Sequence, residues 1–203
     1  MKTLFSVLLM IIGVAVNGQV VLYSTDFGTT PGSFPTGWAS SNTTNGFAAV
    51  TTSASAGYTG ASGSINARFI NTSTTGAVHT LTFNNSLSTI GYSNIRVIWG
   101  VRTTNTFTQS VALEWSSDGT NWNPVTFTQT ANNTDWAFVN SGTPLQLPIE
   151  ASNIANLRLK WSIAVSNDGN YQIDDVKVLG SYEAIVNLHR EVSVTIKVEV
   201  VSE

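Results

Sequence analysis

A break in alternation near the end of the chain constrains the fold more than any other feature. Residues 170–180 read Asn-Tyr-Gln-Ile-Asp-Asp-Val-Lys-Val-Leu-Gly. A strand with one buried face alternates apolar and polar residues. Tyr171 and Ile173 fall on odd positions, whereas the two valines that follow fall on even ones. Both halves share one buried face only if the ladder slips by a residue, so the sequence predicts a β-bulge at Asp174-Asp175.

This predicted bulge carries two of the chain's twelve acidic residues. A partly buried carboxylate needs a cation or several hydrogen-bond donors to stay ionised. Asp174 and Asp175 are therefore the best candidates for a site of any kind. We expect a metal position there rather than a catalytic one.

The N-terminus has the pattern of a secretory signal peptide. Lys2 precedes an almost unbroken apolar run over residues 4–16, and small residues then allow cleavage before Gln19. The run is short for a membrane span, and no basic stop-transfer flank follows it, which disfavours an uncleaved anchor. We therefore expect residues 1–18 to be a signal peptide and the mature chain to be secreted, outside or on the surface of a bacterial cell.

Composition limits what the mature chain can bind. Only 10% of residues are charged and the net charge is −3, which argues against nucleic acid and against a polybasic membrane contact. The hydrophobic share of 42% can sustain a core, so disorder is not expected. The absence of cysteine means that no disulfide supports the domain. Stability must come from that core, with a metal as an additional contributor.

Short β-rich runs separated by Gly, Asn, Ser and Pro predict an all-β domain over residues 19–180. Nine such strands favour a two-sheet antiparallel β-sandwich, a jelly roll. The segment 31–63 has a loop-like composition. The expected strands cover Val20–Phe27, Ala67–Ile70, Ala77–Phe83, Asn94–Thr103, Ser110–Ser116, Asn123–Thr128, Trp136–Asn140, Asn156–Val165 and Tyr171–Leu179.

Parity within three of these strands separates core positions from surface positions. Trp99, Trp115 and Trp161 fall with the apolar sets and are expected in the core. The charged residues opposite them predict a solvated face with cross-strand ion pairs. The alternative is a polar ligand-binding strip formed by Arg102, Glu114 and Lys160.

Three further tryptophans, Trp38, Trp122 and Trp136, lie beside turns or at strand starts. Sugars stack their apolar faces on exposed aromatic rings, so each could serve a carbohydrate site. The competing interpretation for each is packing at the edge of the core. Trp122 and Trp136 are retained as candidate ligand contacts.

An ordered set of motifs resembles the secreted bacterial jelly-roll modules related to carbohydrate-binding, MAM-type and choice-of-anchor domains. The resemblance covers residues 20–180. Its motifs are Asp26-Phe27, Phe34-Pro35-Thr36-Gly37-Trp38, Gly91-Tyr92-Ser93-Asn94-Ile95, Glu114-Trp115-Ser116-Ser117-Asp118-Gly119-Thr120-Asn121-Trp122 and Ile173-Asp174-Asp175-Val176.

The resemblance implies a structural calcium ion. In several sugar-binding jelly rolls a carboxylate near the first strand and an aspartate of the last strand share this ion. The matching positions are Asp26 and Asp175, with Asp174 as the alternate. Many relatives carry Glu after the Phe of the first motif, whereas Gly28 stands here, which removes one potential ligand.

Catalytic motifs are missing from the sequence. There is no cysteine nucleophile, and neither His79 nor His189 has a zinc-ligand partner at helical spacing. No Gly-x-Ser-x-Gly motif occurs, and no strand carries the paired carboxylates of a retaining glycosidase. We expect a non-catalytic binding module for polysaccharide or adhesion. The alternatives are a structural or protein-interaction domain of a cell-surface assembly and, less favoured, a glycoside hydrolase.

Residues 181–203 form a tail that is richer in charge than the domain. Val192, Val194, Ile196, Val198 and Val200 alternate as in a strand with one apolar face. Because such a stripe is unstable in water, we expect the tail either to dock on the sandwich or to drive self-association.

Overall fold

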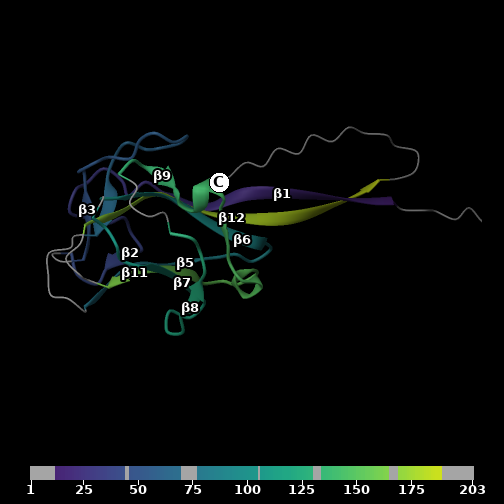
Figure 1. The fold of residues 1–203 in the computed structure, drawn as a ribbon. Coiled ribbons are helices and arrows are strands. Elements are labelled where there is room, and N and C mark those ends of the chain that lie inside the picture. The colour runs from purple at the N-terminus through teal and green to yellow at the C-terminus, as the bar shows by residue number, and fades with distance from the viewer. Residues whose placement is uncertain are drawn as a thin grey trace, which may run out of the picture.

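A computed structural model describes residues 12–43, 46–69, 77–104, 106–129, 134–164 and 169–188, and the side chains within 18–183 of these ranges. The chain folds into two antiparallel β-sheets packed face to face (Figure 1), which confirms the predicted β-sandwich. Its elements are β1 (Ile12–Thr25), β2 (Trp38–Ser40), β3 (Phe47–Val50), β4 (Asn66–Phe69), β5 (Val78–Leu87), β6 (Ser93–Thr103), β7 (Val111–Ser116), β8 (Asn123–Val125), β9 (Ala137–Phe138), η1 (Val139–Gly142), β10 (Leu145–Gln146), η2 (Ile149–Ala151), β11 (Leu157–Ala164) and β12 (Tyr171–Leu188).

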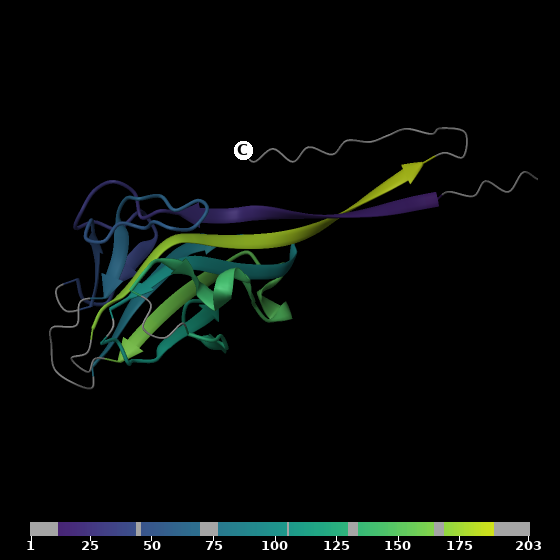
Figure 2. The same ribbon diagram turned by 45° about the horizontal axis from the view of Figure 1, so that its top comes forward.

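The seven-stranded sheet has the order β10-β6-β12-β4-β3, with β1 also paired to β12 and β9 to β6. The first and last strands are therefore adjacent. Together they form a long ribbon that projects beyond the sandwich (Figure 2). The five-stranded sheet has the order β2-β5-β11-β7-β8 and lies beneath it.

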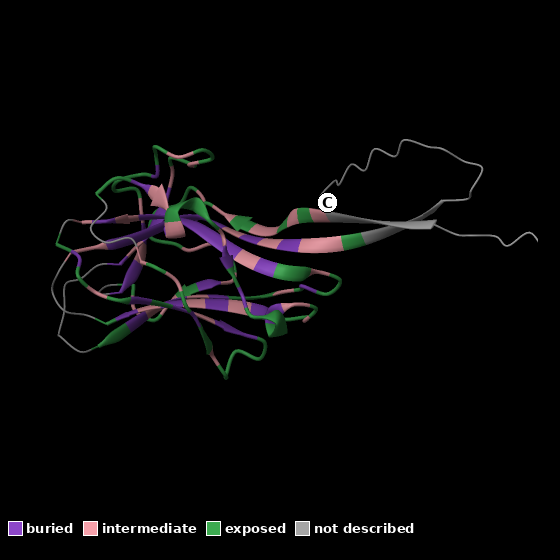
Figure 3. Ribbon diagram, turned by 45° about the vertical axis from the view of Figure 1, so that its right-hand side comes forward, coloured by how far each residue is buried: buried purple, intermediate pink, exposed green. Residues whose placement is uncertain are grey.

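The core between the sheets is rich in aromatic side chains. Trp99, Trp115 and Trp161 are buried, which confirms their predicted core positions. Trp99 meets Trp161 edge-to-face at 5.4 Å between ring centroids, and Trp38 stacks on Trp161 at 5.6 Å. Burial alternates along β11 in the five-stranded sheet, whereas β6 and β12 of the seven-stranded sheet carry runs of consecutive buried residues, 97–101 and 171–176 (Figure 3). The contact between Trp99 of the seven-stranded sheet and Trp161 of the five-stranded sheet thus joins the two layers.

Several predicted segment boundaries differ from the structure, and the first strand begins at Ile12 rather than at Val20. The segment 31–63 is not entirely loop, because it contains β2 and β3, each an edge strand of a sheet. The last strand does not end near Leu179 but continues through Gly180 to Leu188, paired throughout with β1. Within the described ranges, no helix has the length and apolar character needed to cross a bilayer.

Candidate functional site

The predicted bulge is present at Asp174-Asp175. Asp174 stands opposite Gly100 and Lys177 opposite Ile98, so three steps along β12 correspond to two along β6. Asp175 takes a positive φ of 49°, which lets the strand absorb the extra residue. Tyr171, Ile173, Val176 and Val178 are consequently all buried.

Hydrogen bonds from the 51–64 segment, here called the clasp loop, satisfy the bulge carboxylates. The Tyr58 hydroxyl and the Ser62 backbone N–H, at 3.2 Å, both donate to Oδ2 of Asp175. The Ser62 hydroxyl donates to Oδ2 of Asp174 at 3.2 Å. The backbone N–H of Asp175 donates to Oδ1 of Asp174 at 2.8 Å. The clasp loop is thereby fastened across the seven-stranded sheet.

Burial dominates the electrostatics of this cluster. The pKa of Asp174 is raised to about 7, chiefly by desolvation and also by the charge of the neighbouring Asp175, while hydrogen bonds from Ser55 and Ser62 oppose the rise. Desolvation and the hydrogen bond to Asp175 also raise the pKa of Tyr58. Tyr58 therefore acts as a donor at neutral pH, and Asp174 is poised between its two protonation states.

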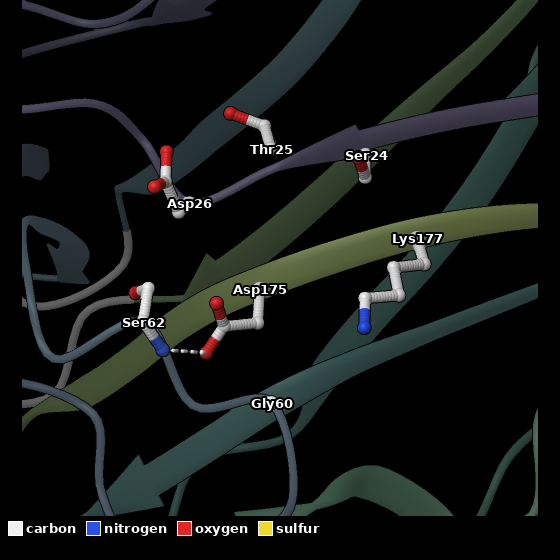
Figure 4. A pocket seen from close by; sticks show the side chains of 7 residues that line it. All are labelled: Ser24, Thr25, Asp26, Gly60, Ser62, Asp175 and Lys177. Atoms are coloured by element: carbon white, nitrogen blue, oxygen red, sulfur yellow. Dashed lines mark hydrogen bonds between the residues drawn. The ribbon is translucent and has the colours of Figure 1, made fainter. Parts of the chain in front are cut away.

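Asp26 and Asp175 line one cavity of about 350 Å³, together with Ser24, Thr25, Gly60, Ser62 and Lys177. Figure 4 shows Asp26, Ser62 and Asp175 grouped at one end and Lys177 at the other. Asp174 does not line this cavity. Across the described ranges, no three Asp, Glu or His side chains come close enough together to hold a metal ion.

This donor set fits calcium in kind, because carboxylates and hydroxyls are hard oxygen ligands. It supplies two of the three predicted carboxylates. The Lys177 ammonium, which lines the same cavity, opposes a second cation. Any calcium bound here would depend on Asp26 and Asp175, with neutral oxygens completing the shell.

A second cavity, of about 420 Å³, lies between the clasp loop and the approach to β9. Arg102, Thr134, Asp135 and Trp136 line it together with four residues of the clasp loop, Ser53, Ala54, Ala56 and Gly57. The Arg102 guanidinium donates to Oε1 of Gln172 at 2.7 Å. The Trp136 indole N–H donates to the carbonyl of Ser53 at 2.8 Å, so a largely buried ring forms part of the wall.

The predicted strip of Arg102, Glu114 and Lys160 is not one surface. Glu114 on β7 and Lys160 on β11 face each other on the five-stranded sheet, with Nζ 2.9 Å from Oε2. Arg102 lies on β6, in the other sheet. Parity identifies outward positions within a strand but not which sheet the strand joins.

Trp122 belongs to the Glu114–Lys160 surface. The ammonium of Lys160 lies 4.2 Å from the centre of the Trp122 ring, a cation–π contact. Trp122 is partly exposed. The predicted cross-strand ion pair is confirmed, and an aromatic ring stands beside it. The five candidate ligand residues thus divide between two places, with Arg102 and Trp136 in the cavity and the others on the opposite sheet.

Sequence reasoning missed Tyr58, Ser62 and Asp135. Tyr58 had one usable signal, because it is a lone aromatic residue between Gly57 and Gly60 in a polar segment. Its hydrogen bond to Asp175 spans 117 positions and could not be inferred from local pattern. The presence of Asp135 and Arg102 in the lining of one cavity likewise depends on how the loops pack.

Comparison of sequences leaves the family open. The model described as ribosomal protein L9, C-terminal domain, matches residues 149–202, well under half of the chain. In this structure that stretch includes β11 and β12, which belong to different sheets of the sandwich. No curated protein sequence matches the chain.

Comparison of structures identifies the fold. The K3 cleaved adhesin domain of Lys-gingipain from Porphyromonas gingivalis superposes with a TM-score of 0.53 at 15% identity, covering 80% of this chain and 99% of that one. The CBM22-1 xylan-binding domain from Paenibacillus barcinonensis Xyn10C gives 0.52 at 14% identity, covering 81% and 97%. The chain therefore has a fold that adhesin and carbohydrate-binding domains also have.

Proposed function

We propose that the chain is a secreted, non-catalytic module that binds extracellular carbohydrate, at the cell surface or in adhesion. The observation that carries this proposal is the cavity that Arg102, Asp135 and the largely buried Trp136 line together. Sugar sites combine a few converging polar groups with an aromatic surface. The fold shared with an adhesin domain and a xylan-binding domain supports the same class.

The cavity has the chemistry to recognise vicinal hydroxyls. A guanidinium presents several N–H donors in one plane, and a carboxylate presents only acceptors. A sugar with neighbouring hydroxyls can donate to Asp135 and accept from Arg102 at once. Gln172 stands opposite Arg102 on the neighbouring strand β12, and its hydrogen bond fixes the direction of the guanidinium before a ligand arrives.

The Trp122–Lys160–Glu114 surface is the second candidate contact for carbohydrate. It lies on the other sheet and presents a partly exposed ring beside an ion pair. A long polysaccharide could bind the cavity of one protein molecule and the Trp122–Lys160–Glu114 surface of another. Variants at each of the two places measure how much each contributes to affinity.

A glycan-array screen first selects ligands. Affinity electrophoresis through gels that contain soluble polysaccharides, xylan among them, then tests the proposal. Arg102→Ala should lower affinity by about tenfold or more, as expected for loss of a charged hydrogen bond. Arg96→Ala is the matched control, because Arg96 lies on the same strand and bonds Gln146 instead. If the polysaccharide gel retards both variants equally, the cavity is not the binding site. Trp122→Ala would then test the other surface.

If no glycan binds, the alternative is favoured, which is a structural or protein-interaction domain of a cell-surface assembly. An enzyme of glycosidase type would require a second carboxylate near Glu114. The group that Glu114 contacts is instead the ammonium of Lys160. A hydrolysis assay on each retained glycan, by reducing-end release, distinguishes binding from turnover.

We propose in addition that Asp26 and Asp175 hold a structural calcium ion in the cavity that they share. Two carboxylates and the hydroxyls of Ser24, Thr25 and Ser62 supply the oxygens. Bound calcium would fix the end of β1 against the bulge of β12. The ion would support the fold and take no part in recognising the sugar.

A further inference from the structure

At the free end of the β1–β12 ribbon, β12 pairs with residues that belong to the predicted signal peptide. β6 makes its last pairing with β12 at Ser93 and Ser181. From Tyr182 to Leu188, the strand that pairs with β12 in the described part of the chain is β1, through residues 12–18 (Figure 2). Signal cleavage before Gln19 would remove that entire stretch. The last seven residues of β12 would then have no strand beside them.

A strand in this condition is unstable as it stands. Its backbone N–H and C=O groups lose their ladder partners along both edges. An exposed edge of this kind recruits another strand. The question is which strand would occupy it in the mature protein.

We propose that residues 192–198 of the same chain replace residues 12–18 beside β12 once the signal peptide is removed. Residues that follow Leu188 and reverse direction run antiparallel to β12, as β1 does. Three-residue connections such as 189–191 are common in β-hairpins. This length sets Val192, Val194, Ile196 and Val198 opposite Leu188, Val186, Ala184 and Tyr182, the positions now held by Ile12, Val14, Val16 and Gly18.

Charge favours this register. Asn17 now stands opposite Glu183, and in the replaced ribbon Lys197 takes the position of Asn17. Opposite charges in a directly facing pair stabilise an antiparallel ladder. A shift of one residue would place Lys197 beside a neighbour without charge and would turn the valine stripe to the other face.

Covalent connection favours the chain's own tail over a second copy. A segment tethered by three residues is present at an effective concentration that a separate molecule reaches only in concentrated solution. One local adjustment is required. The ring of Tyr182 now covers Gly18, where a side chain would collide with it, so Val198 must turn that ring aside.

Disulfide trapping in the exported protein tests the replacement, because the chain has no cysteine of its own. The full chain is exported through its own N-terminal segment, and mass spectrometry establishes the mature start. Val186→Cys with Val194→Cys should form an intramolecular disulfide under mild oxidation, since directly facing residues lie within bonding distance. Val186→Cys with Thr195→Cys is the matched control and should cross-link at least about tenfold more slowly, because its second thiol points to the other face.

Amide hydrogen exchange gives an independent readout without cysteines. Residues 182–188 should be protected in the mature chain and should lose that protection, by about tenfold or more, when residues 189–203 are deleted. Disulfide-linked dimers would overturn the proposal in favour of a second copy. Rapid exchange in the mature chain, equal trapping in the control pair, or retention of residues 12–18 would also overturn it.

Discussion

The hydroxyl of Tyr58 donates a hydrogen bond to Oδ2 of Asp175, although the two residues are 117 positions apart. This bond fastens the clasp loop to the bulge in β12. The same loop, through Ser53, Ala54, Ala56 and Gly57, forms part of the lining of the cavity that contains Arg102. The bulge therefore positions the proposed carbohydrate site as well as the proposed calcium site.

Tyr58→Phe should destabilise the domain. The substitution removes one donor from a buried carboxylate and leaves the ring in place, which costs about 1–3 kcal/mol in the free energy of unfolding. Urea unfolding followed by tryptophan fluorescence measures this difference. Tyr92→Phe is the control, because its partly buried ring packs on the core and its hydroxyl makes no hydrogen bond within the described residues. Equal losses in the two variants would contradict a specific role for the bond to Asp175.

Gly100→Ala should displace the clasp loop from the sheet. A Cβ at Gly100 would overlap the Tyr58 phenol, and Tyr58 is also packed against Phe138 at 4.4 Å between ring centroids. Overpacking of this kind costs about 1–3 kcal/mol. Limited proteolysis should show faster cleavage within residues 51–64, and the double variant with Tyr58→Phe should lose less than the sum of the single losses. Strict additivity would contradict this coupling.

Stability should fall as pH rises from about 4 to about 7. The pKa of Asp174 in the folded chain, about 7, lies above its ordinary value of 3.8, so the folded state binds more protons than the unfolded state within this window. The contribution of Asp174 to stability is greatest below the lower value and is lost as pH passes the higher one, with a slope of at most about 1.4 kcal/mol per pH unit. Asp174→Asn should flatten this slope in urea titrations with chelator present. An unchanged slope would contradict the raised pKa.

Calcium should raise the melting temperature, and chelator should lower it. At 100 times the dissociation constant, an ion that binds only the folded state adds about 2.7 kcal/mol. Asp26→Asn should abolish the difference with little other effect, because Asp26 is exposed and its hydrogen bond to Gly28 can be retained by the amide oxygen. Glu150→Gln, an exposed change at η2, is the control. Superimposable melting curves with calcium and with chelator would contradict the calcium site.

Local pattern in the sequence was sufficient for the sandwich and for the bulge. The change of parity between Ile173 and Val176 identified the extra residue, because a strand has only two faces and burial must choose one. The apolar parity of Trp99, Trp115 and Trp161 placed them in the core for the same reason. Both properties are local, and each was confirmed in the structure.

Tertiary structure alone decided which residues share a site. Arg102, Glu114 and Lys160 have the same outward parity, yet the strand order places Arg102 in one sheet and the other two in the opposite one. β2 and β3 were missed because each has four residues or fewer, and because β2 pairs with β5 further along the chain while β3 pairs with β4 across the clasp loop. The contact of Tyr58 with Asp175 arises from packing of a loop across a sheet. Sequence periodicity reports the face of a strand, whereas long-range pairing determines its neighbours.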